Sequence, residues 1–301
     1  METRQCSILP ARMTTLRTIR TSCSPGGTVL KGLTGKVAII TGAGRGIGQG
    51  LAVALAAEGV NLVVNDLDAG PLTETVALVE AEGGLALAVA GSVLDEGMPE
   101  RLVGEAMGRF GDLHVVTTCA GYTWDVMFHR MTDEQWTAML DVHLTGTMRV
   151  VRESFRVMRE RAQFEQDQER DPVARKIITV SSMSSFGNLG QANYAAAKAG
   201  VVGLTRAIAL EGARSNILAN SVAFGPIDTR LTRPRESQEE KLGESVLGIP
   251  EEARERYLST IPLGRVGSLE EAVGPLMFLA SAQANYLSGV LLEVNGAAHI
   301  S

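Results

Sequence analysis

The chain has 301 residues, of which 45% are hydrophobic and 21% are charged, and its 28 Lys and Arg against 34 Asp and Glu give a net charge of −6. This balance argues against a nucleic-acid partner, which usually requires a basic excess, and no stretch approaches the ~18 uninterrupted apolar residues of a membrane span. Three cysteines, Cys6, Cys23 and Cys119, are too few and too scattered for a disulfide framework or a zinc site, so we expect a reducing, cytoplasmic environment.

The first 30 residues differ in composition from the rest of the chain. They are rich in Ser, Thr and Arg and contain a single acidic residue, Glu2. This composition fits an organellar transit peptide, and it also fits a disordered tail or an over-long start with Met13 as an alternative beginning. We expect residues 1–30 to be a disordered or targeting-like extension and residues 31–301 to form one domain.

From residue 36 onward, short apolar runs alternate with amphipathic stretches. Runs rich in β-branched residues and too short for helices predict strands at 36–41, 60–65, 85–90, 114–118, 176–180, 217–222 and 290–294. Helical periodicity predicts helices at 47–57, 71–81, 99–109, 133–161, 191–211 and 269–280. Strands that alternate with helices pair in parallel through right-handed crossovers. The pattern predicts an α/β fold: a doubly wound, Rossmann-type parallel sheet in a single domain.

Two polar segments interrupt this alternation. Residues 163–175 are highly polar, and we expect a solvated helix end and loop there. Residues 230–257 are also charged and follow the carboxyl end of a predicted strand, the edge at which ligands bind in such sheets. A mobile substrate lid and a plain surface loop are both open interpretations of this second segment.

A glycine-rich run, Thr41-Gly42-Ala43-Gly44-Arg45-Gly46-Ile47-Gly48, follows the first predicted strand. Glycines at a strand-to-helix turn let the backbone approach a pyrophosphate, whose charge is met by the amides at the helix N-terminus. The spacing Gly-x-x-x-Gly-x-Gly differs from the commoner Gly-x-Gly-x-x-Gly, and an ordinary glycine-rich turn is the competing interpretation. The strand–turn–helix context favours a dinucleotide site.

Asp66 ends the second predicted strand, 18 residues after Gly48. A carboxylate at this place accepts hydrogen bonds from a ribose 2′-hydroxyl and repels a 2′-phosphate, so we expect NAD rather than NADP. Two alternatives stay open: Asp66 is a turn residue, or Arg45 assists a phosphate.

Tyr194 and Lys198 are four residues apart on a predicted helix and therefore share one face. A phenol titrates near pH ~10 by itself, and a neighbouring ammonium favours the phenolate and lowers that pKa. Tyr194 can then exchange a proton with a substrate oxygen while a nicotinamide exchanges hydride. A hydroxyl of Ser181 or Ser182, at the end of the preceding strand, would hydrogen-bond the same oxygen.

Together these motifs resemble the short-chain dehydrogenase/reductase family, from about Leu33 to the end of the chain. The shared motifs are 41–48, Asp66, Ala120-Gly121, Ser181-Ser182, 190–194, Lys198, 220–223, 227–229 and 261–267. The resemblance implies that Tyr194 is the general acid/base and that Lys198 modulates its pKa and contacts the ribose. It also implies that Ile227 and Thr229 lie near the nicotinamide carboxamide, with Thr41, Arg45, Ile47, Ala120 and Gly121 in the same cofactor site.

The resemblance leaves the choice of serine open. The family's usual spacing of thirteen residues to the tyrosine selects Ser181. The strand register of residues 176–182 instead selects Ser182, provided that the following loop is one residue shorter than usual.

Three other positions depart from the family pattern. Thr118-Cys119 replaces Asn-Asn, Phe224 replaces the proline before Gly225, and His143 replaces an asparagine of the proton relay. Histidine at this position resembles a branch that includes hydroxyacyl-thioester dehydrogenases, and it can both donate and accept hydrogen bonds. The alternative is a structural histidine bonded to backbone. Cys119 is interpreted as a small packed apolar group.

We therefore expect an NAD-dependent oxidoreductase that interconverts a ketone and a secondary alcohol of small-molecule size. The segment 190–198 is most similar to 3-oxoacyl-thioester reductases and their dehydrogenase relatives, and the resemblance implies a homodimer or homotetramer. The rival hypothesis is a cofactor-binding sensor or scaffold without turnover. The substitutions at Cys119 and His143 support it, and the presence of the serine pair, Tyr194 and Lys198 argues against it.

Overall fold

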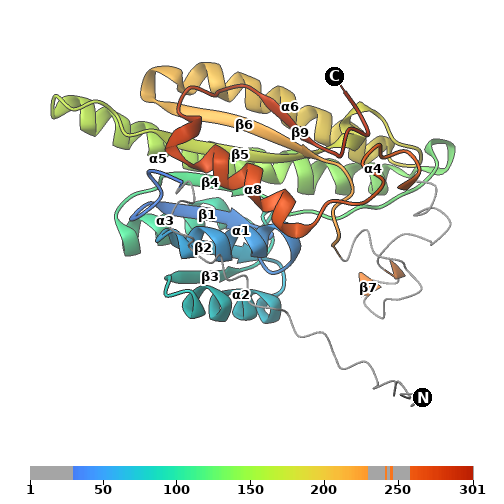
Figure 1. Cartoon of the computed structure of the whole chain (residues 1–301), viewed down its shortest axis with the longest axis horizontal. Coiled ribbons are helices and arrows are strands. Elements are labelled where there is room, and N and C mark those ends of the chain that lie inside the picture. The colour runs from blue at the N-terminus through green and yellow to red at the C-terminus, as the bar shows by residue number, and fades with distance from the viewer. Residues whose placement is uncertain (1–29, 230–240, 243–244, 247–257, 301) are drawn as a thin grey trace, which may run out of the picture.

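The computed structural model describes residues 30–229, 241–242, 245–246 and 258–300. One sheet of seven parallel strands, in the order β3-β2-β1-β4-β5-β6-β9, runs through these residues (Figure 1). Its strands are β1 (Val37–Thr41), β2 (Asn61–Asp66), β3 (Ala86–Ala90), β4 (Val115–Thr118), β5 (Arg175–Ser182), β6 (Ile217–Phe224) and β9 (Leu291–Val294). The predicted doubly wound parallel sheet is confirmed. A separate pair, β7 (Lys241–Leu242) and β8 (Ser245–Val246), is antiparallel.

Helices cover both faces of the sheet because alternate residues of the buried strands point to opposite sides. Ala38 and Ile40 of β1 pack with helices α1 (Gly46–Ala57), α2 (Ala69–Ala81) and α8 (Leu269–Ala280). Val37 and Ile39 pack on the other side with α3 (Met98–Phe110), α5 (Gly146–Asp167) and α6 (Ala192–Gly212). Two apolar cores therefore form, one on each face.

The helix predicted at 133–161 is divided in the structure. It consists of α4 (Asp133–Leu140), a π-helical turn η2 (Asp141–Thr145) and α5, which continues to Asp167. Leu144 of the π turn packs against α6 at Gly200, where a Cβ would lie 2.9 Å from Leu144 Cδ2. The π turn η2 thus occurs where this segment packs closely against a helix that is distant in sequence. The apolar periodicity of the sequence does not predict such a turn.

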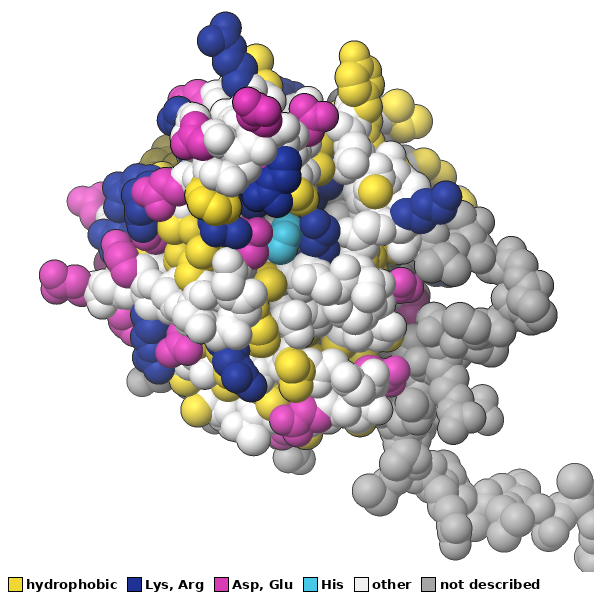
Figure 2. Space-filling model, turned by 90° about the vertical axis from the view of Figure 1, so that its left-hand side faces the viewer, with side chains coloured by type: hydrophobic (Ala, Val, Ile, Leu, Met, Phe, Trp, Pro, Cys, Tyr) yellow, Lys and Arg dark blue, Asp and Glu magenta, His cyan; other side chains and the backbone are white. Residues whose placement is uncertain are grey.

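The expectation that residues 163–175 are solvated is wrong for Glu165 and Arg175, which are both buried. The Arg175 side chain is completely buried and donates to Glu165 Oε1 at 2.8 Å and to Asp112 Oδ1 at 3.2 Å. Arg175 is the first residue of β5 and therefore lies at the amino-terminal edge of the parallel sheet. Figure 2 shows the molecule from the left-hand side of Figure 1, a face on which basic and acidic side chains are interspersed. Removal of one partner from a buried pair is strongly destabilising, because a charge remains buried and unpaired.

The same edge of the sheet carries a buried histidine, from which a pH dependence of stability follows. His114 Nδ1 accepts the N–H of Val37 at 3.1 Å, and burial lowers the pKa of His114 to about 4. The unfolded chain takes up this proton near pH ~6.5 and the folded chain does not, so the free energy of unfolding falls as the pH falls from about 6.5 to 4, by up to about 3 kcal/mol. Urea unfolding at several pH values measures how the free energy of unfolding changes with pH. The same pH dependence in His114→Asn would show that His114 is not its cause.

No helix among the described residues is long and apolar enough to cross a bilayer. The expected extension at 1–30 lies outside the described residues apart from Leu30. Within 230–257, where a lid or a surface loop is expected, only β7 and β8 are described.

Candidate active site

The chain leaves the neighbouring strands β1 and β4 toward opposite faces of the sheet. Helix α1 follows β1 on one face, and α5 lies on the other face after β4. In open α/β sheets, ligands bind outside the carboxyl ends of the strands at such a switch point. The glycine-rich run begins at Thr41, the last residue of β1, and Ala120-Gly121 follows Thr118, the last residue of β4, after one intervening residue.

The glycine turn is tightly packed against the chain that leaves β4. Gly42 has a φ of 65°, and a Cβ there would lie 2.5 Å from the Ala120 backbone nitrogen. A Cβ at Gly48 would overlap the Gly42 carbonyl. Gly46 also has a positive φ, 56°, and begins α1, so the free amides of the helix N-terminus lie at the turn. These features fit a pyrophosphate group.

Asp66 is brought directly to this turn. Its Oδ2 accepts the N–H of Gly44 at 2.8 Å, which holds the carboxylate beside the glycine backbone. Arg45 lies nearby and pairs with Asp68 through Nη1 and Oδ2 at 3.0 Å. The Asp66 carboxylate therefore lies at the glycine turn, while the guanidinium of Arg45 is paired with another acid, Asp68.

Tyr194 and Lys198 lie on the first turns of α6. Lys198 Nζ is 5.6 Å from the centroid of the Tyr194 ring and donates to the Val180 carbonyl at 2.7 Å. Burial lowers the pKa of Lys198 to about 8, so the ammonium form still predominates at pH 7. Burial also raises the pKa of the Cys119 thiol to about 12, so the thiol is un-ionised. The Tyr194 ring therefore lies beside a positively charged group.

The two serines at the end of β5 have different partners. Ser181 is 2% exposed, and its hydroxyl donates to the Lys198 carbonyl at 3.0 Å under helix α6. Ser182 is half-buried, and its Oγ accepts the N–H of Ser184 at 3.1 Å. Because Ser182 is the acceptor in this bond, its hydroxyl hydrogen is not used by it.

His143 is buried in the π turn between α4 and α5. Its Nε2 lies 2.6 Å from the carbonyl oxygen of Tyr122, and its ring meets the Tyr194 ring edge-on at 4.9 Å between centroids. The predicted relay position is thus next to the predicted acid/base.

Two polar residues of the segment 190–194 anchor the loop after β4, a role that the sequence analysis missed. Gln191 Nε2 donates to Asp125 Oδ1 at 2.9 Å. Asn193 is fully buried, and its Nδ2 donates to the carbonyls of Trp124 and Gln135 at 3.2 and 3.0 Å. The two amide side chains among the three residues before Tyr194 could have predicted this role, since buried amides require hydrogen-bond partners.

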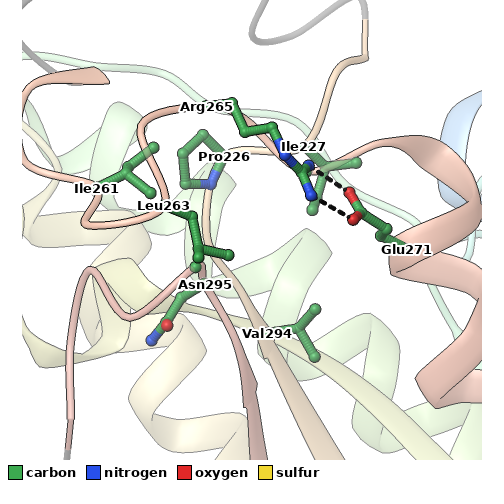
Figure 3. A pocket seen from close by; sticks show the side chains of 10 residues that line it. Pro226, Ile227, Ile261, Leu263, Arg265, Glu271, Val294 and Asn295 are labelled. Carbon is green, nitrogen blue, oxygen red and sulfur yellow. Dashed lines mark hydrogen bonds and ion pairs between the residues drawn. The ribbon is translucent and has the colours of Figure 1, made fainter.

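Ile227 and Thr229 follow β6 and reach the same edge. Thr229 Cγ2 would lie 3.7 Å from a Cβ at Gly46, which places residue 229 at the glycine turn. Ile227 lines a pocket of about 140 Å³ beside the Arg265–Glu271 ion pair (Figure 3). This volume is below the roughly 300 Å³ that is typical of a small-molecule site.

Residues 36–240 match the family model described as short chain dehydrogenase. The 3-oxoacyl-(acyl-carrier-protein) reductase FabG of Thermotoga maritima is 35% identical over 265 residues, 88% of this chain and 98% of that protein. The 3-oxoacyl-(acyl-carrier-protein) reductase of Synechocystis sp. is 35% identical over 88% of this chain and 97% of its own length. A crystal structure of a short-chain type dehydrogenase/reductase from Mycobacterium marinum has a TM-score of 0.78 and 28% identity, over 89% of this chain and 97% of that one. The chain therefore belongs to the short-chain dehydrogenase family and is an NAD(P)-dependent oxidoreductase that acts on CH–OH groups.

Proposed function

We propose that Ser182, Tyr194 and Lys198 carry the interconversion of a ketone and a secondary alcohol. The observation that carries this proposal is the position of the Lys198 ammonium, 5.6 Å from the Tyr194 ring, at the edge where the glycine turn lies. In reduction, the phenol of Tyr194 donates a proton to the substrate oxygen, and the ammonium stabilises the phenolate left behind. The Ser182 hydroxyl donates a hydrogen bond to the same oxygen. A nicotinamide cofactor, when bound at the glycine turn, would supply or accept the hydride.

The cofactor we propose is NAD, bound by the glycine turn, Asp66, Ala120-Gly121 and the segment 227–229. The Asp66 carboxylate, held by the Gly44 N–H, would accept from a ribose 2′-hydroxyl and repel a 2′-phosphate. We expect Asp66→Ser to lower kcat/KM with NADH by about tenfold and to raise the ratio of NADPH to NADH activity, since one charge-assisted hydrogen bond is lost. Steady-state kinetics with both cofactors measures this; an unchanged ratio would contradict the assignment.

The substrate we propose is a 3-oxoacyl thioester. Exposed apolar side chains gather on two loops at the start of α6, namely Trp124, Met127, Phe128 and Leu189. The loops are joined, because the Val126 N–H donates to the Gly190 carbonyl at 2.7 Å. An apolar surface of this kind suits an acyl chain, and the relatives from Thermotoga maritima and Synechocystis sp. are named for such substrates.

The proposed function is tested with purified protein, NADH or NADPH, and 3-oxoacyl thioesters of increasing chain length. We expect kcat/KM to rise by up to about fourfold for each methylene that the apolar surface covers, and a short ketone to be a poor substrate. Equal activity with short ketones and long thioesters would contradict the acyl substrate and leave the ketoreductase chemistry standing. Cofactor binding without turnover of any substrate would instead favour a sensor or scaffold, for which the compared proteins offer no support.

We also propose that the enzyme acts in the cytoplasm as a homodimer or homotetramer. The scarcity of cysteine in the sequence supports the compartment, and the family resemblance supports the assembly. Light scattering of the purified full chain measures the oligomeric state.

A further inference from the structure

His143 joins three parts of the active site that are distant in the chain. Its imidazole belongs to the π turn η2 and is 2% exposed. Nε2 lies 2.6 Å from the carbonyl oxygen of Tyr122, in the loop after β4. The ring also contacts Tyr194 of α6 edge-on, with an interplanar angle of 84°. One side chain therefore contacts both that loop and the residue we propose as the proton donor.

The hydrogen-bond partners of the imidazole define its tautomer. A carbonyl oxygen only accepts hydrogen bonds, so Nε2 must carry the hydrogen that Tyr122 receives. Nδ1 is buried and has no hydrogen-bond partner among the residues that the structure describes. A hydrogen on Nδ1 would add a second buried donor with no acceptor, which is costly. The geometry therefore corresponds to the neutral ring with its hydrogen on Nε2.

The surroundings of the ring oppose its protonation. The Lys198 ammonium and the Tyr194 ring face it from α6, and the carbonyl and the phenol ring of Tyr122 face it from the loop. Burial first, and the positive charge of Lys198 second, hold the pKa of His143 well below its ordinary value, against the opposite effect of the Tyr122 carbonyl. An imidazolium at this place would repel the ammonium that the chemistry needs.

Gly121 supplies the space that the ring occupies. A Cβ at Gly121 would overlap Cε1 of the His143 imidazole. The imidazole thus lies directly on the backbone of the strand-end segment Ala120-Gly121, and it cannot shift toward that segment. The ring is held by the loop carbonyl on one side, by the glycine backbone on another, and by Tyr194 on a third.

We propose that His143 is a positioning residue: it remains the neutral Nε2–H tautomer, ties the loop after β4 to Tyr194, and takes up no proton during turnover. The proposal rests on the proposed function, because Tyr194 is the group that it positions. It differs from a proton relay, in which the imidazole would gain and lose a proton.

The tautomer is read directly from the ¹⁵N chemical shifts of the histidine side chains in the full-length protein. We expect one protonated Nε2 and one unprotonated Nδ1 for His143, with shifts that do not change between about pH 5.5 and 8. His143→Asn identifies the signal by its disappearance, and His129→Asn, at an exposed position of the loop, serves as the matched assignment control. A hydrogen on Nδ1, or titration of His143 within that range, would overturn the proposal.

Kinetics then separates positioning from proton transfer. We expect His143→Leu to lower kcat by about 10- to 100-fold through misplacement of Tyr194. His143→Asn keeps an N–H donor for the Tyr122 carbonyl and should recover part of that loss, with the wild-type pH profile of kcat. A pH midpoint that moves in His143→Asn, or wild-type kcat in His143→Leu, would refute the positioning role. Because the NMR measurement needs no substrate, it decides the tautomer even if the proposed reaction fails.

Discussion

Replacement of Tyr194 with phenylalanine is expected to lower kcat for ketone reduction by about 10²- to 10⁴-fold, the usual contribution of a positioned general acid. The substitution removes only the phenolic oxygen, so the ring that packs edge-on against His143 remains. The Lys198 ammonium stays in place through its bond to the Val180 carbonyl. Proton donation is therefore lost while the framework of the site is kept.

Absorbance of the reduced cofactor during turnover measures this loss, and fluorescence titration with NADH checks that the cofactor still binds. Tyr286→Phe is the matched control, because Tyr286 is fully exposed on the surface. We expect Tyr286→Phe to retain wild-type kcat. Full activity in Tyr194→Phe would refute the proposed chemistry.

The second large effect distinguishes the two adjacent serines. We expect Ser182→Ala to lower kcat/KM by about 10²- to 10³-fold, as for the loss of one donor to a developing oxyanion. Ser182 Oγ already accepts the N–H of Ser184, which orients its hydrogen toward other acceptors. Ser181 instead donates to the Lys198 carbonyl and is buried beneath α6.

Ser181→Ala is therefore the natural control for Ser182→Ala. It should cost about 1 kcal/mol of stability through one lost hydrogen bond and change kcat/KM by only a few fold. Thermal unfolding and steady-state kinetics of both variants measure the two effects. The opposite pattern, with the larger kinetic loss in Ser181→Ala, would assign the substrate contact to Ser181.

Regular elements were predictable wherever the signal was local. The strand predicted at 36–41 corresponds to β1, and the helix predicted at 269–280 is α8 with the same bounds. Ser268 begins that helix with a capping box to Glu271, a signal contained in four consecutive residues. Elements of this kind depend on neighbours in the chain.

The misses have a common physical origin. The π turn around His143 forms where Leu144 packs on Gly200, a contact between segments that are distant in sequence. Arg175 is buried because Asp112 and Glu165 meet it from other elements. The charge pattern of the sequence predicts that such an arginine is exposed to solvent, because the pattern does not show which acidic residues will pair with it in the fold.

The family, the parallel sheet and the candidate set around Tyr194 and Lys198 were all predictable from the sequence, because they depend on local periodicity and on short motifs, each contained in one stretch of the chain. The sequence did not show which hydroxyl of Ser181 and Ser182 bonds to α6, or which ring nitrogen of His143 carries the hydrogen; the folded structure does. Those answers depend on the carbonyls of Lys198 and Tyr122, which reach the site from separate segments of the chain. The sequence states which side chain stands at each position, whereas the fold determines which group that side chain bonds to.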